Sequence, residues 1–172
     1  IDRTRFPFTE NDLPGFDGRS DLPAFLRDYR LKGWNLFQTI PMPSTNDEAW
    51  RRTDLRGLRA SELSLRATLP KRNLRPPRNL LRPLVGNKHG GQIIVVPTYQ
   101  TTEQVKEEWR KQGILFEDLR TAQREHVDFL ANAMGQIVRP EEGKFAALAT
   151  AFAEDDVIVY IPRGVRLKEP LH

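Results

Sequence analysis

The strongest strand pattern of the chain ends only ten residues before its last residue. Asp155–His172 reads "DDVIVYIPRGVRLKEPLH", in which the β-branched run Val157–Pro162 is typical of a strand and Arg163–Gly164 of a turn. Val165–Pro170 alternates in character and predicts a short second strand. A strand must pair its backbone donors and acceptors, and almost nothing follows this one. The fold therefore depends on what pairs with it.

Helical patterns dominate the first third of the chain. Ser20 as an N-cap and Gly33 as a stop bracket a first predicted helix. Thr45 followed by Glu48 fits a capping box and predicts a short helix that carries Trp50. The apolar face of the first helix consists of Leu22, Phe25, Leu26 and Tyr29.

Further helices are predicted in the second half. Thr101 with Gln104 forms another capping-box pattern, opening a helix to about Lys111. The clearest helix is predicted over 116–135, with Gly135 at its C-cap position, and one more helix follows Pro140. The face of the former consists of Leu119, Ala122, His126, Phe129, Leu130 and Ala133. The stripe of the latter consists of Phe145, Leu148, Ala149 and Phe152.

Proline and glycine interrupt the middle of the chain. Four prolines and three glycines in Leu69–Gln92 exclude a continuous helix and predict a long Arg/Pro-rich loop near 69–92. The run Ile93–Pro97 predicts a short buried strand ended by proline. The fold class predicted from these patterns is α+β, rich in helices, with β structure beginning at the end.

Composition limits the compartment and class. The 172 residues suffice for one modest core, and no apolar run approaches a membrane span. The absence of Cys excludes disulfides and thiolate metal sites in this chain, so a cytoplasmic location is the default. The chain begins with Ile rather than Met, which indicates a processed product or a fragment, and its first residues show no signal-peptide pattern.

No catalytic constellation is found in the sequence. His89, His126 and His172 lie far apart along the chain, and a continuous helix would turn Glu125 and Asp128 away from His126, so no metal site is predicted. The Gly-rich "GNKHGG" lacks the Lys-Ser/Thr pair of a phosphate-binding loop. Neighbouring carboxylates, such as those at 107–108 and 141–142, are expected on solvated faces.

A basic stretch offers an alternative function. Residues 51–88 hold nine Arg and two Lys against Asp54 and Glu62, a balance of +9, which leaves the rest of the chain at −5. Such a stretch could bind phosphates or an acidic protein surface. However, residues 55–88 contain no aromatic side chain for base stacking and match no known nucleic-acid motif, which argues against nucleic-acid binding.

Three phrases of the sequence resemble the SufB/SufD family of iron–sulfur cluster assembly proteins. Pro41–Leu55, "PMPSTNDEAWRRTDL", is similar to the SufD-type phrase P-x-P…E-x-W-R-x-T-x-L. Lys111–Val138 resembles a family helix with an F-x-dL…eh pattern, and Lys144–His172 is similar to KFaALN…Y-V-P-k-G-v…P. Two departures are Ala149, where the family usually has Asn, and "EDD", where it has a Gly-containing turn.

The resemblance implies a fold and its division. A helix-rich N-terminal region would lead into the first coil of a right-handed parallel β-helix, a fold in which each coil packs on its neighbours. The implied domains are a helical region over 1–140, with the strand near 93–97, and a capping helix with the start of the β-helix over 141–172. The later coils would then pair the terminal strand.

The resemblance also implies a function, most like that of SufD. The chain would be the N-terminal part of a non-catalytic scaffold subunit in a cytoplasmic complex that assembles and delivers iron–sulfur clusters. A SufB-like paralogue and a SufC-type ABC ATPase would bind through segments outside this chain, and a homodimer through the open strand edge is possible. The cluster is implied only for the intact complex, with no cofactor in this chain.

No catalytic, cofactor-binding or metal-ligating residue is carried over from the family. The residues that match its phrases are expected to be structural: Trp50, Arg51, Thr53, Leu55, Phe145, Leu148, Tyr160, Pro162, Gly164 and Pro170. Two other readings stay open, a nucleic-acid-binding or adaptor module that uses residues 51–88, and a β-helix capping domain with an unrelated partner.

Overall fold

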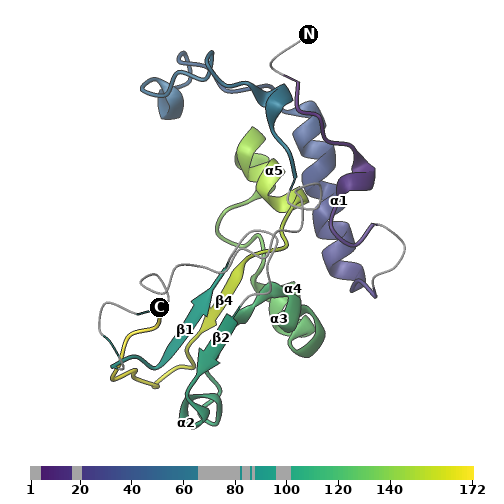
Figure 1. Ribbon diagram of the computed structural model, residues 1–172. Coiled ribbons are helices and arrows are strands. Elements are labelled where there is room, and N and C mark those ends of the chain that lie inside the picture. Colours follow the sequence, from purple (N-terminus) through teal and green to yellow (C-terminus); the bar gives the residue numbers. More distant parts are fainter. Residues whose placement is uncertain (1–4, 17–20, 66–81, 83–85, 87, 96–101) are drawn as a thin grey trace. The chain divides into compact units, whose positions relative to one another are not determined.

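The computed structural model describes residues 5–16, 21–65, 82, 86, 88–95 and 102–172 (Figure 1). The chain forms two compact units whose segments interleave in sequence. The first comprises Ile1–Leu65 with His126–Glu154, and the second Arg66–Glu125 with Asp155–His172. The predicted helix start Thr101 and most of the Arg/Pro-rich loop lie outside the described residues. The N-cap predicted at Ser20 is wrong, because the first helix begins at Ala24 with Pro23 as its N-cap residue.

Two helices organise the first unit, α1 (Ala24–Thr39) and α5 (Lys144–Ala151). The buried positions of α1 recur at helical spacing, which places one face against α5. The predicted stop at Gly33 is wrong, because α1 continues through it to Thr39. The helix needs a residue without a side chain here: a Cβ on Gly33 would lie 2.6 Å from the backbone nitrogen of Ala151.

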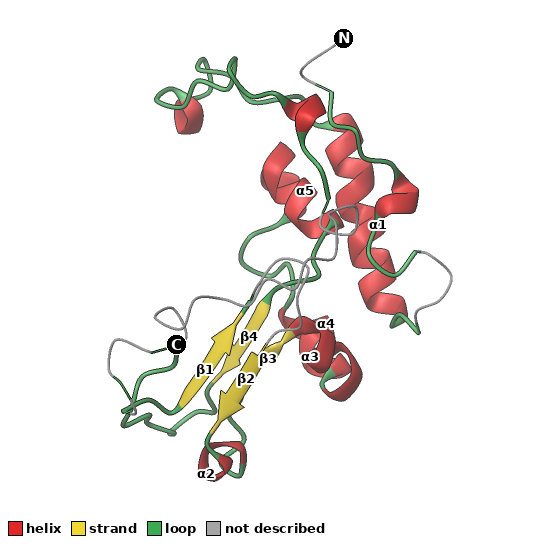
Figure 2. Cartoon of the chain, viewed as in Figure 1, coloured by secondary structure: helices red, strands yellow, loops and turns green. Residues whose placement is uncertain are grey.

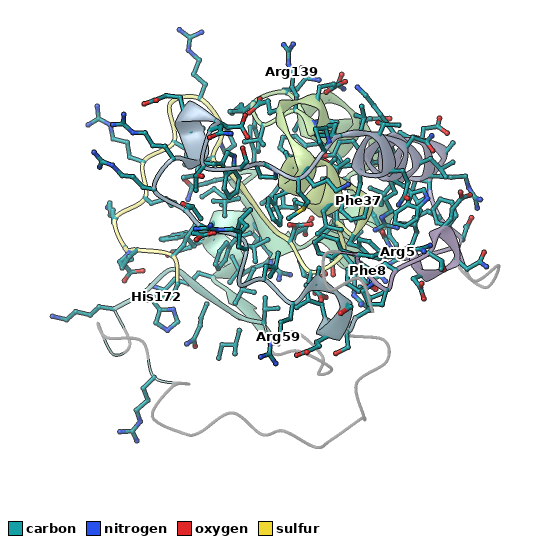
Figure 3. All side chains as sticks on the ribbon, turned by 90° about the horizontal axis from the view of Figure 1, so that it is seen from above. Arg5, Phe8, Phe37, Arg59, Arg139 and His172 are labelled. Carbon is teal, nitrogen blue, oxygen red and sulfur yellow. The ribbon has the colours of Figure 1, made fainter. Side chains whose placement is uncertain are left out.

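An aromatic core fills the space around these helices. The Phe6 and Phe37 rings meet edge to face with centroids 5.2 Å apart, and Phe8 lies against both Phe6 and Phe152. Figure 3 labels two members of this aromatic core, Phe8 and Phe37. The buried members of the core are Phe6, Leu13, Trp34, Phe37, Ala60, Ala147 and Ala151.

The helix predicted after Pro140 is confirmed, with a different buried face. A 3-10 turn, η5 (Pro140–Glu142), precedes α5, and the buried residues of α5 are Ala147, Thr150 and Ala151. Phe145, Leu148 and Phe152 are partly buried against the core. Ala149 is exposed, so its place in the predicted apolar stripe is wrong.

Short turns complete the first unit: η1 (Glu10–Asp12), η2 (Glu48–Trp50) and η3 (Ala60–Glu62). A helix carrying Trp50 does form, but as the single 3-10 turn η2, and its N-cap is Asp47 rather than Thr45. The Asp47 carboxylate accepts a hydrogen bond from the Ser44 backbone nitrogen at 2.7 Å. That bond closes the turn from Ser44 to Asp47 that precedes η2, where the Asp47 nitrogen also donates to the Ser44 oxygen at 3.0 Å.

The second unit contains two antiparallel strand pairs (Figure 2). β1 (Gly91–Ile94) pairs with β2 (Thr102–Val105), with Gly91 opposite Val105. The strand predicted near 93–97 is therefore present, two residues earlier. The helix predicted from Thr101 is wrong over 102–105, and only the short α2 (Glu107–Arg110) follows. Trp109 of α2 is buried against the backbone of Gly90.

The terminal strand has a partner within the chain. β4 (Val157–Tyr160) confirms the predicted strand and pairs antiparallel with β3 (Leu115–Asp118), Phe116 opposite Val159. The expectation that this strand lacks a partner is wrong. The apolar residues of 115–118 continue the helical spacing of the helix that follows them. The sequence pattern therefore does not distinguish this four-residue strand from the start of the helix.

The long helix predicted over 116–135 is divided. Leu119–Glu125 forms α3 and Val127–Ala133 forms α4, with non-helical His126 between them. Gly135 follows the C-cap residue of α4 with φ +71°, in keeping with its predicted role at the helix end.

The second strand predicted over Val165–Pro170 does not form. Instead, Leu171 and His172 at the end of the chain bond to β1. The turn before them is confirmed, with the Val165 nitrogen donating to Pro162 at 3.1 Å. Val165–Pro170 is irregular, and Leu171 then forms a parallel bridge to Gly91. The right-handed parallel β-helix stays a prediction. No helix in the described part of the chain is long and apolar enough to cross a membrane.

Candidate functional site

Two hollows of the first unit lie beside the segment that joins α1 to η2. The segment Pro41–Pro43 is extended because proline fixes its backbone and cannot continue α1. Met42 and Pro43 line both hollows, so the two adjoin. We call them the Asp54 hollow and the Trp50 hollow.

The Asp54 hollow has a volume of about 390 Å³ and a largely apolar lining. Asp54 and Arg56 form an ion pair at it, with the Arg56 Nη2 atom 2.7 Å from the Asp54 Oδ2 atom. The Arg56 Nε atom and backbone nitrogen also donate to this carboxylate, at 3.0 and 2.9 Å. These hydrogen bonds lower the pKa of Asp54 to about 2. The lining consists of Met42, Pro43, Ser44, Thr45, Asp54, Leu55, Arg56, Leu58 and Ala60.

The Trp50 hollow is larger, about 580 Å³, and joins two distant parts of the sequence. Trp50 of η2 packs on Phe145 of α5 with ring centroids 5.3 Å apart and an angle of 33° between the planes. Both rings are half-buried. Acidic residues of both segments, Asp47, Glu48 and Glu142, line the same hollow.

Lys144 contributes the positive charge to the lining of the Trp50 hollow, but its amine binds to the end of α1. The Lys144 Nζ atom donates to the backbone oxygen of Phe37 and lies 4.4 Å from the centroid of the Phe37 ring. Burial lowers the pKa of this ammonium. Lys144 therefore holds α5 onto the end of α1.

Of the ten residues that match the family phrases, six lie in the first unit and four in the second. Trp50 and Phe145 meet in the Trp50 hollow, Leu55 lines the Asp54 hollow, and Arg51 pairs with Glu48 at 3.3 Å. The Thr53 nitrogen donates to Trp50, which continues the turn of η2, and Leu148 packs on the core.

The remaining four phrase residues lie in the second unit. Tyr160 ends β4 opposite Leu115, Pro162 and Gly164 form the turn that follows, and Pro170 accepts a hydrogen bond from Gly90. Gly164 has φ +86°, which favours glycine there. The resemblance phrases thus contribute to one site, the Trp50 hollow, and to the framework of the strand pairs.

The histidines are placed differently from the prediction. His89 and His172, distant in sequence, lie with ring centroids 6.1 Å apart in the second unit. His126 lies between α3 and α4, so the argument from one continuous helix does not apply to it. The absence of a metal site stays a prediction.

Three arginines in the described part of the basic stretch pair with carboxylates. Arg51, Arg56 and Arg59 pair with Glu48, Asp54 and Glu62 at 3.3, 2.7 and 3.4 Å. Such pairing leaves these arginines less available to phosphates. Most of residues 66–88 lie outside the described residues, so the nucleic-acid alternative stays a prediction.

Sequence reasoning did not find either hollow. The Asp54–Arg56 pair carried a local signal, an acid and a base two residues apart in an exposed turn. The contact of Trp50 with Phe145 had no local signal in the sequence, because this contact depends on how α5 packs beside α1. Only the resemblance singled out both aromatic residues.

Comparison with known proteins decides the family. The model of the SufBD protein N-terminal region matches residues 19–172, which is most of the chain. The chain belongs to the SufB/SufD family. The resemblance found in the sequence is confirmed, including its restriction to the N-terminal region.

Individual relatives of this SufB/SufD chain come from plants and bacteria. The iron–sulfur cluster assembly SufBD family protein ABCI9 of Arabidopsis thaliana is 27% identical over 165 residues, 87% of this chain and 35% of the relative. In Bacillus subtilis (strain 168), SufB is 26% identical over 87% of this chain and 33% of SufB, and SufD is 24% identical over 98% and 38%.

The chain thus spans little more than a third of the length of these curated relatives. No solved structure matches it. These relatives are named for iron–sulfur cluster assembly.

Proposed function

We propose that this chain is the N-terminal part of a SufD-like scaffold subunit in a complex that assembles iron–sulfur clusters and delivers them to apo-proteins. The observation that carries the proposal is the family match over residues 19–172. The phrase with Trp50, Arg51 and Thr53 favours SufD over SufB, because it resembles the SufD type.

The scaffold role is non-catalytic, and the partners are a SufB-like paralogue and a SufC-type ATPase in the cytoplasm. These partners would bind through parts of the subunit other than this chain. Support for a packing role comes from the contacts of the phrase residues, which serve helix packing, turns and strand ends. In this proposal β4 and the turn after it lead into a parallel β-helix, and the cluster is cargo of the complex.

Exchange of the N-terminal region tests the proposal. Residues 1–172 would replace the matching 38% of Bacillus subtilis SufD in one chimera and the matching 33% of SufB in another. Each chimera would be expressed in a strain that lacks the corresponding subunit. The readouts are co-purification with the SufC-type ATPase and the activity of an iron–sulfur enzyme in the cell.

Both chimeras keep the segments that are proposed to bind the ATPase, so both are expected to co-purify with it. Only the SufD chimera is expected to restore the activity of the iron–sulfur enzyme. Restoration by the SufB chimera alone would contradict the SufD assignment. Failure of both chimeras, although each is folded and soluble, would contradict the scaffold function itself. A chimera with Gly33→Val serves as the misfolding control, since the larger side chain cannot fit against Ala151.

A further inference from the structure

The Trp50 hollow has chemistry that a purely structural role does not use. Its aromatic wall is formed by Trp50 and Phe145, both only half-buried, so part of each ring is open to solvent. Its volume of about 580 Å³ is within the range of sites that bind small ligands or single side chains. An open aromatic surface beside polar groups is typical of recognition sites.

The charges of the lining favour a cation. The lining contains the carboxylates of Asp47, Glu48 and Glu142 and the ammonium of Lys144. Glu48 is paired with Arg51 at 3.3 Å, so Asp47 and Glu142 supply the negative charge of the hollow. All three carboxylate residues are exposed, whereas the Lys144 amine lies against Phe37 and its carbonyl oxygen. A negative rim around aromatic rings attracts a positive group and repels phosphate and carboxylate ligands.

Two of the carboxylates are held in place by the backbone. Asp47 accepts from the Ser44 nitrogen through Oδ2 at 2.7 Å, and Glu142 accepts from the Arg139 nitrogen through Oε1 at 3.0 Å. A carboxylate has about four acceptor positions, so each retains capacity for further donors. The Arg139 side chain itself is exposed and points outward (Figure 3).

We propose that the Trp50 hollow binds an arginine side chain of a partner protein. The guanidinium stacks on the exposed face of Trp50 and donates hydrogen bonds to the carboxylates of Asp47 and Glu142. Arginine fits better than lysine, because its planar fork can stack on a ring and bind carboxylates together. The inference stands on the first unit alone and does not rest on the SufD-like function.

The test follows the indole N–H signals of the ¹⁵N-labelled 172-residue chain. Trp50 is half-buried, while Trp34 and Trp109 are 7% and 5% exposed and serve as internal references. The probe is Nα-acetyl-arginine-N-methylamide, and its uncharged match is the citrulline compound. We expect a saturable shift of the Trp50 signal alone, with a dissociation constant on the order of 1–10 mM, and binding of citrulline weaker by about fivefold or more.

Matched variants locate the contacts. Asp47→Asn and Glu142→Gln keep an oxygen for the backbone bonds but lose the charge, so each should weaken binding about two- to fivefold. Glu62→Gln removes an exposed carboxylate of the same unit outside the hollow and should change nothing. Trp50→Leu removes the reporting indole, so binding to this variant is followed by the backbone amide signals of Asp47 and Glu142. We expect no saturable shift of these signals, with the Trp34 signal reporting that the unit is still folded.

Several outcomes would overturn the inference. They are equal binding of arginine and citrulline, a shift of Trp34 or Trp109 in place of Trp50, and no shift at about ten times the expected dissociation constant. A calcium salt that displaces the arginine probe would assign the carboxylates to a metal ion instead. Equal loss in Glu62→Gln and Glu142→Gln would reduce the effect to net charge.

Discussion

Gly33 of α1 lies directly against the backbone of Ala151 in α5. A Cβ atom at residue 33 would be 2.6 Å from the Ala151 nitrogen and 2.7 Å from the Thr150 Cγ2 atom. The two helices therefore approach more closely than side chains would allow. This contact aligns α5 with α1, and the start of α5 carries Phe145 to Trp50.

Gly33→Ala is expected to destabilise the first unit by about 1–2 kcal/mol. Overpacking against backbone costs about 1–3 kcal/mol, and alanine returns up to about 1 kcal/mol through its higher helix propensity. The measurement is urea unfolding followed by tryptophan fluorescence. Gly57→Ala is the matched control, because nothing lies within 4 Å of its added Cβ. An unchanged midpoint in Gly33→Ala would contradict the close contact.

Arg30→Lys is expected to destabilise the same unit by about 2–3 kcal/mol. Arg30 is 2% exposed, and its guanidinium donates to two separate backbone oxygens. The Nε and Nη2 atoms donate to the Ala153 oxygen at 3.0 and 2.5 Å, and Nη1 donates to the Pro14 oxygen at 2.6 Å. A lysine ammonium lacks the fork that reaches both oxygens.

Thermal unfolding of Arg30→Lys and Arg59→Lys would measure this difference. Arg59 is exposed and meets Glu62 at only 3.4 Å, so its change should cost less than about 0.5 kcal/mol. Similar losses of unfolding free energy in both variants would mean that the buried guanidinium of Arg30 contributes no more to stability than a surface ion pair.

Gly90→Ala is expected to disrupt the second unit, by about 3 kcal/mol. An added Cβ would lie 1.6 Å from the Trp109 Cη2 atom, inside the indole ring. NMR should show displacement of the Trp109 indole signal, while the Trp34 signal of the first unit stays in place. The clash is specific to this pair, so Trp109→Leu should lose less stability in the Gly90→Ala background than in the original chain. If the stability losses of Gly90→Ala and Trp109→Leu were additive in the double variant, direct contact between these two residues would be contradicted.

The helices were predictable where their signal is local. The stripe after Pro140 and the apolar residues before Gly33 follow helical spacing, and both helices are present. The end of α1 was not predictable, because the reason for Gly33 lies in α5, far along the chain. Glycine reads as a stop in a single sequence, although close helix packing requires it equally well.

The strands show the same limit. β4 was predicted from its β-branched residues, but its partner β3 is four residues long and precedes a helix that continues its apolar pattern. The capping-box pattern at 101–104 was overridden in the same way by pairing of β2 with β1. These residues form strands because they pair with distant segments of the chain. Local strand or helix propensity does not predict such pairing.

The candidate site was partly predictable. The resemblance marked Trp50 and Phe145, and the structure shows that they form one wall of a hollow. Of the carboxylates beside them, Glu142 was expected on a solvated face, and it is exposed. Each of Asp47 and Glu142 is held by a local bond to the backbone three residues earlier. Their presence in one hollow depends instead on how α5 packs beside α1, which no spacing in the sequence predicts.

The carboxyl group of Asp54 is expected to titrate with a pKa of about 2, against its usual 3.8, because Arg56 donates hydrogen bonds to the charged form. Carbon-13 chemical shifts of the side chain measure this pKa. Arg56→Gln removes the fork and should return the pKa toward 3.8. Arg59→Gln, whose partner is Glu62, should leave the titration of Asp54 unchanged and serves as the control.

The sign of the pH effect follows from linkage. The folded chain holds the Asp54 proton less tightly than the unfolded chain, so the pair contributes stability above the unfolded pKa of about 3.9. That contribution is lost as the pH falls from about 4 through about 2. Unfolding measured across this window should show a slightly weaker acid dependence in Arg56→Gln. A carboxyl that titrates near 3.8 in the original chain would mean that the ion pair beside the Asp54 hollow does not persist in solution.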